Sequence, residues 1–429
     1  LSMIEPPVEP EPRPNSPVVL EPLPYQLRLC EFFRAEEPTL WQWFRGASHR
    51  AKEIENFKFE LLKTTYRIDR QSQPTLYEAA DDVARRLGVD APITIYQAHN
   101  PEGRNAALVR IPGEVHLVLH GDLAAQLTPV ELRALFGHEL THFVMHSRWN
   151  GDLATVERML VAICNERHSH PAHHQSLRYL SLYGETLCDR GAFEVVGDLN
   201  AVVTMLLKFH TGVRDVDAAA FLRQIDEIFA KGPSWSEGLS HPEAYIRARA
   251  MKLWAECREA SAGQNANDAT QRANDAIAEM IEGRPDLGAL DLLQQRQVAT
   301  GTRRVLDALF AHRWFRTDQT LAHARRFFPK YTPIESSQLA KDWPQDVRVE
   351  PQGMADYHAF LLLDFVAADH ELDAPAMALA IVTAERLGIK PRFLELARQE
   401  LKLRKQQLEK IEQDRERLMQ EAEQERVAS

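Results

Sequence analysis

Apolar residues recur at helical spacing along most of the chain, and the most clearly bounded helix is predicted over residues 128–147. Thr128 can cap its first turn, Pro129 suits the first helical position, and Glu131 completes a capping box. The apolar residues of this segment lie on several faces of the helix: Val130, Leu132, Leu135, Phe136, Leu140, Phe143 and Val144. A helix that is apolar on several sides packs inside a domain, so a core helix is predicted.

Three short strand-like runs precede this helix, at residues 93–96, 105–110 and 114–119. A helical stripe over residues 76–87 comes before them and ends at Gly88, a residue typical of helix ends. The pattern therefore predicts an α+β fold that is mostly helical, with a small twisted sheet before the core helix. An edge strand of such a sheet has free amides and carbonyls, to which an extended peptide can pair.

The predicted core helix contains the motif His138-Glu139-x-x-His142. Two histidines four residues apart lie on one face of a helix, where both imidazoles can bind one metal ion. Zinc held by three protein ligands keeps a position open for water, lowers the pKa of that water and polarises a carbonyl. Glu139 can take the water's proton and pass it to the leaving amine. The capped, apolar helix around the motif favours a metal site over a chance match.

A third ligand is predicted in the segment that contains Glu185 and Asp189. These two residues are also four apart and share a helical face, so Glu185 can bind the metal while Asp189 accepts a hydrogen bond from a ligating imidazole. The alternative is a solvated glutamate beside an unrelated aspartate. The metal-binding motif earlier in the chain favours the ligand pair.

With these motifs, the sequence resembles the HtpX and CAAX-prenyl-protease family of zinc metallopeptidases, peptidase family forty-eight, over about residues 61–253. Four segments carry the resemblance, in the order expected for that family: Asn105-Ala106, residues 131–143, residues 185–192, and His241-Pro242 followed by Arg247. The resemblance implies a zincin-like domain of the gluzincin type, in which the zinc ligands are His138, His142 and Glu185.

The resemblance also implies roles for the residues around the metal. Glu139 would be the general base and Asp189 would orient a ligand. The strand that begins with Asn105 and Ala106 would bind extended substrate backbone. His241 and Arg247 would lie near the cleft as catalytic residues, where an imidazole or a cation stabilises the oxyanion.

Two features depart from that family. Leu187-Cys188 stands where the family more usually has Ala before its Asp, and the hydrophobic spans of the membrane-bound members are missing. The second departure removes the argument for a prenylated or intramembrane substrate. The predicted substrate is therefore a protein or peptide of unspecified sequence.

Composition bears on the number of domains, the partners and the cellular compartment expected for the protein. A length of 429 residues suggests two or three domains, and the 44% of hydrophobic residues is ample for a sizeable core. The formal charge of -11 disfavours nucleic acid as a partner. The four scattered cysteines, with no framework spacing, indicate reduced thiols: Cys30, Cys164, Cys188 and Cys257. No uncharged apolar run reaches 18 residues, and no basic-then-apolar leader is seen, so a soluble cytoplasmic protein without a membrane span is expected.

The C-terminal part is predicted to be helical, with a compact module near residues 353–402. An apolar helix, an acidic turn at residues 369–373 and a second helix resemble the TerB-like fold of tellurite-resistance proteins. Ala374 and Ala380 occupy the sixth and twelfth positions of the turn, which excludes an EF-hand. The turn is either an acidic helix cap or a metal site. Beyond Pro391, residues 392–427 read as one long charged helix, either solvated or forming a short coiled coil.

The full organisation predicted from these patterns has six parts, and two of them keep open alternatives. The first part, rich in Pro and Glu, is predicted to be either a flexible tail or a strap over a groove, with the active site as one such groove. The histidines at 168–174 form either a solvated loop or a second metal site. The parts are an extended arm at 1–24, N-terminal helices at 25–56, a zinc metallopeptidase domain at 57–255, a helical linker region at 256–352, the TerB-like module at 353–402 and a charged helical tail at 403–429.

The sequence thus predicts a zinc-dependent endopeptidase in which Glu139 activates a zinc-bound water. The alternative, from another functional class, is a zinc-stabilised stress-response or interaction scaffold that binds a protein partner through its TerB-like module.

Overall fold

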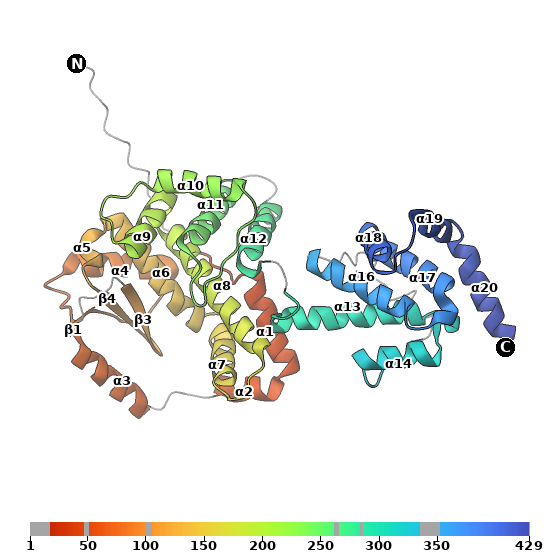
Figure 1. The fold of residues 1–429 in the computed structure, drawn as a ribbon. Coiled ribbons are helices and arrows are strands. Elements are labelled where there is room, and N and C mark those ends of the chain that lie inside the picture. Colours follow the sequence, from red (N-terminus) through yellow and green to blue (C-terminus); the bar gives the residue numbers. More distant parts are fainter. Residues whose placement is uncertain are drawn as a thin grey trace, which may run out of the picture. The chain divides into compact units, whose positions relative to one another are not determined.

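The chain forms two compact units, Leu1–Gly283 and Arg284–Ser429, in a computed structural model (Figure 1). The structure describes residues 18–46, 51–99, 105–260, 266–283, 286–334 and 352–428, and within these ranges it leaves out the side chains of 51–53, 352–353 and 425–428. Both units are dominated by helices, and the first also holds one small sheet. The predicted mostly helical α+β fold is therefore confirmed.

The sheet has four strands in the order β1-β2-β4-β3. β2 pairs parallel with β4, whereas the β1–β2 and β3–β4 pairs are antiparallel. The strands are β1 (Thr65–Arg67), β2 (Ile93–Ala98), β3 (Asn105–Ile111) and β4 (Glu114–His120). The three predicted strands are confirmed, while β1, only three residues long, was not predicted. β3 lies at one edge, so its outer side can accept another strand.

The predicted core helix is present as α6 (Pro129–Ser147). The Thr128 hydroxyl accepts a hydrogen bond from the Glu131 amide, and the Glu131 carboxylate accepts one from the Thr128 amide. Lys208, from α9 (Leu199–Thr211), pairs with the same buried carboxylate at 2.8 Å. The start of α6 is thus fixed both by its own capping box and by a neighbouring helix.

α8 (Pro171–Val196) packs along α6 at very short range. A methyl group on Gly191 would lie 1.9 Å from the Thr141 hydroxyl oxygen, and one on Gly137 would lie 2.9 Å from the backbone of Ala192. Because neither glycine has a side chain, the two helix backbones can approach closely. This contact places the face of α8 that carries Glu185 against the histidine face of α6.

The remaining helices of the first unit surround this pair. The Val18 amide donates to the Arg86 carbonyl of α4 (Pro74–Leu87), and Leu20 is buried in the same core cluster as the apolar side of that helix, so this stretch starts beside α4. Residues 1–17 of the predicted arm lie outside the described residues. The helices are α1 (Pro24–Glu36), α2 (Pro38–Gly46), α3 (Ala51–Thr64), α4 (Pro74–Leu87), α5 (Leu123–Gln126), α7 (Asp152–Cys164), α10 (Ala218–Ala230), α11 (Ala244–Ala260) and α12 (Ala266–Glu282).

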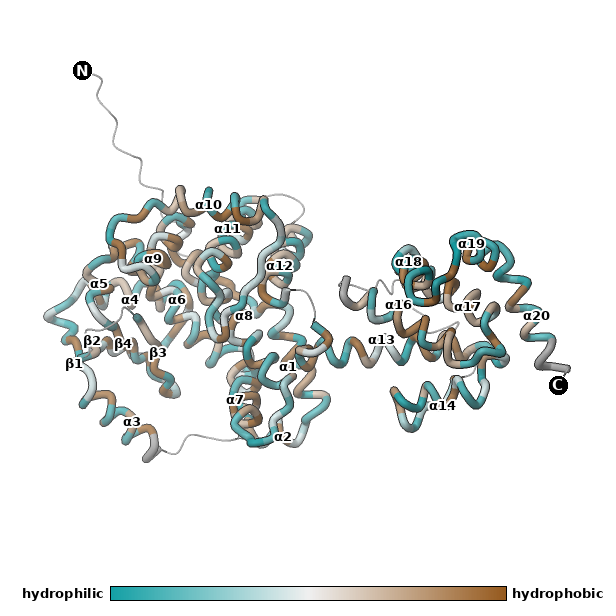
Figure 2. Tube along the Cα trace, in the orientation of Figure 1, coloured by the Kyte–Doolittle hydropathy of each residue, from teal (hydrophilic) through white to brown (hydrophobic). Residues whose placement is uncertain are grey.

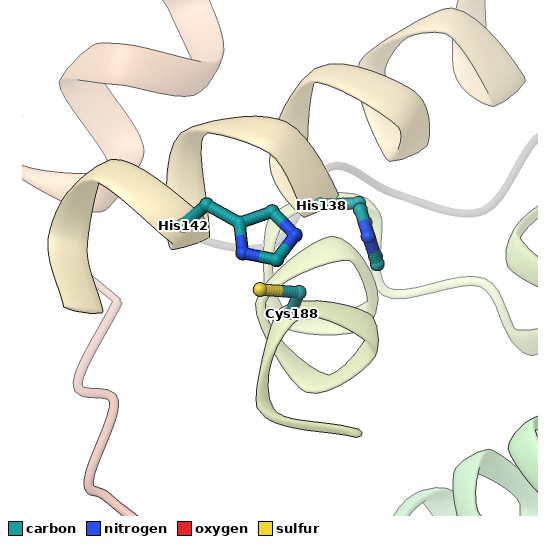
Figure 3. A group of neighbouring side chains, drawn as sticks. All are labelled: His138, His142 and Cys188. Carbon is teal, nitrogen blue, oxygen red and sulfur yellow. The ribbon is translucent and has the colours of Figure 1, made fainter. Parts of the chain in front are cut away.

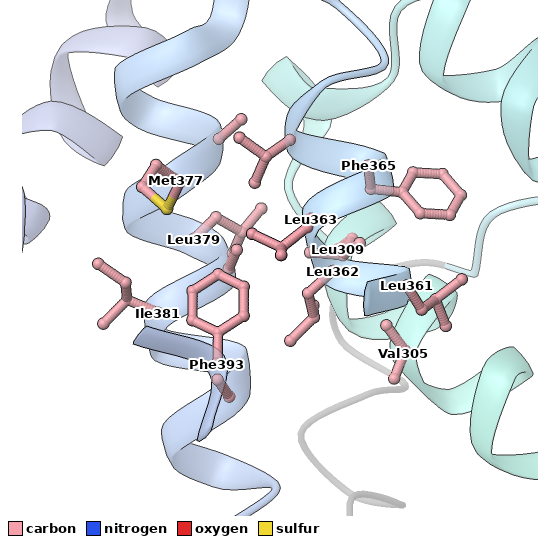
Figure 4. Packing of buried hydrophobic residues seen from close by; sticks show 14 of the residues in the cluster. Val305, Leu309, Leu361, Leu362, Leu363, Phe365, Met377, Leu379, Ile381 and Phe393 are labelled. Atoms are coloured by element: carbon pink, nitrogen blue, oxygen red, sulfur yellow. The ribbon is translucent and has the colours of Figure 1, made fainter. Parts of the chain in front are cut away.

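The second unit is a helical bundle with its own apolar core. Figure 4 shows leucine, isoleucine and phenylalanine side chains from neighbouring helices that meet in this core. At the predicted acidic turn, the buried Asp369 side chain accepts a hydrogen bond from the Glu371 amide. The main helices are α13 (Leu292–Phe310), α14 (Asp318–Phe327), α16 (Gln352–Val366), α17 (Asp373–Arg386), α18 (Lys390–Glu400), α19 (Lys405–Gln413) and α20 (Arg415–Ala428).

The prediction of one long helix over residues 392–427 was wrong. The chain breaks between α18 and α19, where Lys402 takes a φ of 53°, and again before α20. Leu408 of α19 is buried in the core of the second unit, and Leu401 and Ile411 pack against that core. Figure 2 shows the contrast between the largely hydrophobic α17 and the mostly hydrophilic α20. These apolar residues of the predicted long helix therefore pack within the second unit.

Candidate metal centre and active site

The three predicted metal ligands lie together in the first unit. His138 and His142 are one turn apart on α6, with ring centroids separated by 5.2 Å. The Nε2 atom of His138 lies 3.4 Å from Glu185 Oε2, and the Nε2 atom of His142 lies 3.5 Å from Glu185 Oε1. His138 and Glu185 are buried, and His142 is partly buried. Two imidazoles and one carboxylate therefore face a common point.

The two imidazole–carboxylate separations, each to a different oxygen of Glu185, are those expected between ligands of a tetrahedral zinc ion. Ligand atoms that each lie about 2.0–2.1 Å from such an ion are about 3.4 Å from one another. In addition, Glu185 Oε2 is buried without a hydrogen-bond donor, although Arg247 lies 3.5 Å from it. A buried carboxylate oxygen without a hydrogen bond is uncommon unless an ion binds there. The donor set and its spacing thus suit zinc.

Asp189 holds His138 in the orientation that metal binding requires. Its Oδ1 lies 3.0 Å from His138 Nδ1, and because a carboxylate only accepts, Nδ1 carries the proton. Nε2 is then left to face Glu185. Arg247, on α11, donates from Nε and from one terminal nitrogen to the two Asp189 oxygens, at 2.8 and 2.6 Å. The three buried side chains form one chain of hydrogen bonds behind the ligands.

The electrostatics of the centre favour a cation. Burial opposes a charge on His138, but the hydrogen bond to Asp189 and the nearby Glu185 carboxylate outweigh it and raise the pKa of His138 to about 10. Burial lowers the pKa of His142 to about 3, so its Nε2 keeps a free lone pair. Without metal, a proton on His138 Nε2 neutralises Glu185. A metal ion would take the place of that proton.

Glu139 lies beside the ligands and next to the edge strand. It is buried, and burial raises its pKa to about 7. A carboxyl group with a pKa near neutrality suits a general base or acid. Glu139 also accepts a hydrogen bond from the Leu108 amide of β3. Since alternate amides of an edge strand point the same way, those of Ala106 and Arg110 also point outward.

Cys188 is a further donor near the centre, which the sequence marked only as a departure from the family pattern. Figure 3 shows its sulfur beside His138 and His142, and the three ligand atoms lie within 4.8 Å of one another. Burial raises the pKa of this thiol well above its ordinary value, and Sγ donates to Met145 Sδ. A protonated thiol is a poor metal ligand. The Glu185 carboxylate is negatively charged and lies 3.4 and 3.5 Å from the two imidazoles, so it is a stronger candidate ligand than the Cys188 thiol.

His241 and Arg247 both contact Glu185, but the His241 side chain is largely exposed whereas that of Arg247 is buried. His241 Nε2 lies 3.4 Å from Glu185 Oε1, and its side chain is 58% exposed. The loop before α11 that carries it is held by Arg178, which donates to the carbonyls of Ser236 and Gly238. Arg247 is buried, and its hydrogen bonds go to Asp189.

A cleft of about 350 Å³ opens over this centre. Asn105 and Ala106, predicted to bind substrate, are part of its wall, and β3 borders it. The residues that line the cleft on the metal side are His138, Glu139, His142, Glu185, His241 and Arg247. The cleft therefore joins a free strand edge to a candidate metal centre.

Comparison with known proteins supports a metallopeptidase. Over 217 residues, 47% of the chain, the sequence is 28% identical to plastoglobule-localized metallopeptidase 48, chloroplastic, from Arabidopsis thaliana. The chain is a distant relative of a metallopeptidase. The match spans 62% of that protein, less than two thirds of its length. No family model matches the chain, and no solved structure does.

The name of the relative places that protein in the plastoglobules of chloroplasts. In the part of this chain that the structure describes, no helix has the length and apolar character needed to cross a bilayer.

Proposed function

We propose that this chain is a zinc-dependent endopeptidase. The observation that carries the proposal is the meeting of His138 Nε2, His142 Nε2 and the Glu185 carboxylate, at separations of 3.4 and 3.5 Å, in a cleft bordered by an edge strand. A zinc ion bound by these three residues would supply a Lewis acid that polarises a peptide carbonyl and increases the acidity of water. The relationship to a metallopeptidase supports the same conclusion.

Glu139 is the proposed proton carrier. It is next to His138 in sequence, it lines the cleft, and its raised pKa suits a group that both takes and gives a proton near neutral pH. Glu139 would remove a proton from the attacking water and then protonate the amine of the leaving peptide. This is the role that decides whether the site cleaves peptide bonds or only binds metal.

Substrate binding is assigned to β3. The outward amides of Ala106 and Arg110 can pair with an extended peptide, which would then lie across the ligands. His241, at the cleft wall and largely exposed, is the group proposed to stabilise the oxyanion. For Arg247 we propose a positioning role through Asp189, because its Nε and one terminal nitrogen already donate to that carboxylate.

The proposal is tested by separating metal binding from cleavage. Glu139→Gln should keep one zinc ion per chain, measured by elemental analysis, and lose peptide cleavage by about two to four orders of magnitude. His142→Ala should lose zinc and cleavage together. His323→Ala, in the second unit, is the matched histidine control and should keep both. Cleavage by Glu139→Gln at the parent rate would contradict the mechanism.

Two further parts of the prediction remain proposals. We place the protein in the cytoplasm, and we infer a protein partner for the helical module at residues 353–402. Both can be examined in cells that produce the full chain, by imaging and by crosslinking from the second unit.

A further inference from the structure

Three polar side chains connect the edge strand β3 to the helix that carries the two histidine ligands. Glu157, on α7, accepts a hydrogen bond from Arg110 of β3 at 2.8 Å and one from His146 Nε2 of α6 at 2.7 Å. The other ring nitrogen of His146 lies 2.5 Å from the carbonyl of His142. Since a carboxylate and a carbonyl only accept, His146 donates from both nitrogens. We call these three side chains the Arg110–Glu157–His146 link.

The link lies at one end of the cleft wall that β3 forms. Asn105 and Arg110 are the two ends of the part of β3 that lines the cleft, and His146 and Glu157 line it as well. At about 3.3 Å per residue, this part of the strand is about 17 Å long. The Arg110 amide is one of the outward amides proposed to pair with a substrate. The link therefore holds the residue at which such pairing would begin or end.

The strand β3 needs a contact of this kind because it has a neighbouring strand, β4, on one side only. On its outer side, the Leu108 amide donates to Glu139, which is the proposed proton carrier. That contact therefore involves a reacting group. The Arg110–Glu157–His146 link joins β3 to α6 without any side chain proposed to bind the metal or to carry the proton. It can hold the strand independently of the reaction.

The carboxylate of Glu157 is ordered before Arg110 binds it. The His146 side chain is 18% exposed and that of Glu157 is 29% exposed, whereas Arg110 is 53% exposed. An isolated exposed ion pair contributes little, because both side chains lose conformational freedom when they pair. Here His146 already fixes the carboxylate from the α6 side, so less freedom is lost when Arg110 binds. The link therefore favours one position of Arg110.

We propose that Glu157 and His146 are positioning residues for substrate binding, which act through Arg110 to hold one end of β3 where its amide pairs with the peptide. This inference rests on the proposed peptidase function and adds to it the residues that position the strand. The link requires no free charge on Arg110, because Glu157 already binds that side chain.

The first test measures peptide binding to the zinc-loaded full chain with Glu139→Gln. The probe is a fluorescent octapeptide, selected from a random library because this chain retains it and His142→Ala does not. A second change, Arg110→Met, should weaken its binding by about two- to tenfold, and Arg110→Lys, which keeps a cation near Glu157, should restore most of the affinity. Unchanged affinity in Arg110→Met would overturn the inference.

The matched control is Arg70→Met. Arg70 is 52% exposed, pairs with the carboxylate of Asp81 and lies outside the lining of the cleft. This variant also loses an exposed arginine of the first unit, so any general effect of such a loss would appear in it. It should bind the octapeptide as tightly as the chain with Glu139→Gln alone.

Shortened peptides separate positioning from a general distortion of the site. Two forms of the octapeptide each lack two residues at one end, and one of them no longer reaches Arg110. For that form, the chains with and without Arg110→Met should bind alike, whereas the other form should keep the difference. An equal loss of affinity for both forms would contradict a role at one end of β3.

A double-mutant cycle tests whether the side chains act as one link. Glu157→Gln should weaken binding about as much as Arg110→Met, and the two changes together should cause little further loss. Circular dichroism confirms that each variant is folded under the conditions used. Asp81→Asn with Arg70→Met is the control pair. Losses that add fully in the Arg110 and Glu157 pair would contradict the link.

Cleavage by the chain with an intact Glu139 distinguishes this inference from the proposed function. Arg110→Met should raise KM by the same factor as it weakens binding, with kcat and zinc content near those of the parent. A lower kcat at an unchanged KM would overturn the positioning role and leave the peptidase function intact. If the parent cleaves no peptide, the peptidase proposal fails, and the binding measurements alone decide the role of the link. A library that yields no such octapeptide would overturn substrate pairing with β3 and this inference with it.

Discussion

Asp189 holds two side chains of the candidate metal centre at once, because its oxygens accept from His138 and from Arg247. The spacing of Glu185 and Asp189 on one helical face predicted the first contact. The second depends on α11, 58 residues further along the chain, and no local pattern reveals it. Cys188 shows the same limit, because a sequence does not tell whether a thiol near a ligand points toward the metal or into the packing of α6 against α8.

Arg247→Met tests the positioning role at this scale. The change leaves the buried Asp189 carboxylate without its cation, which costs about 3–5 kcal/mol of folding free energy. His138 also loses its fixed orientation, so zinc affinity should fall by about 10–100-fold. The measurements are urea unfolding and zinc competition with a chelator. Arg249→Met, a partly exposed arginine on the same helix that pairs with Asp226, should change neither. An unchanged zinc affinity in Arg247→Met would refute the positioning role.

Among the secondary-structure elements, the pairing of α6 with α8 decides whether the ligands converge. Sequence patterns predicted α6 well, because a capping box and apolar spacing are local signals. The contact with α8 depends on Gly137 and Gly191, whose importance appears only when the two backbones are seen together. The three-residue strand β1 and the break near Lys402 were missed for a related reason: tertiary packing overrides local preference at both places.

Gly191→Ala should push the two helices apart. The new methyl group would lie 1.9 Å from the Thr141 hydroxyl oxygen, so stability should fall by about 1–3 kcal/mol, and zinc should bind more weakly. Urea unfolding and metal titration measure both effects. Gly46→Ala is the control, because no atom lies within 4 Å of its added methyl group. Parent-like stability of Gly191→Ala would mean that the helices are not packed as closely as described.

The contacts of Glu157 with His146 and Arg110, which link α7 to α6 and β3, should make stability depend on pH. Burial alone would raise the pKa of Glu157, but the hydrogen bond from His146 and the charge of Arg110 outweigh it and lower the pKa from 4.5 to about 2. A depressed carboxyl pKa stabilises the fold above pH 4.5, and this contribution is lost as the pH falls toward 2. The parent chain should therefore exceed Glu157→Gln in stability by about 2–3 kcal/mol at pH 6.

Urea unfolding of the two proteins at several pH values below 6 checks this expectation. The difference should shrink steadily as the pH falls below 4.5. Glu60→Gln, in an exposed pair with Lys63, should follow the parent at every pH. A difference that stays constant across this range would show that the ionisation of Glu157 does not stabilise the link.

For the whole molecule, the sequence predicted the fold class and brought the ligand residues into one hypothesis, while its division into six parts stays a prediction. The structure divides the chain after Gly283, within the region predicted as a helical linker at 256–352. Each unit has its own buried core. The cleft and the candidate metal centre both belong to the first unit, so the chemistry proposed for this protein is contained in it.

X-ray absorption spectroscopy of the zinc-loaded full chain tests the central claim most directly. His138, His142 and Glu185 should give only nitrogen and oxygen neighbours, at about 2.0–2.2 Å from zinc. The spectrum of Cys188→Ala should match that of the parent, whereas Glu185→Gln should bind zinc weakly or with a changed shell. A sulfur neighbour at about 2.3 Å that disappears in Cys188→Ala would contradict the proposed ligand set.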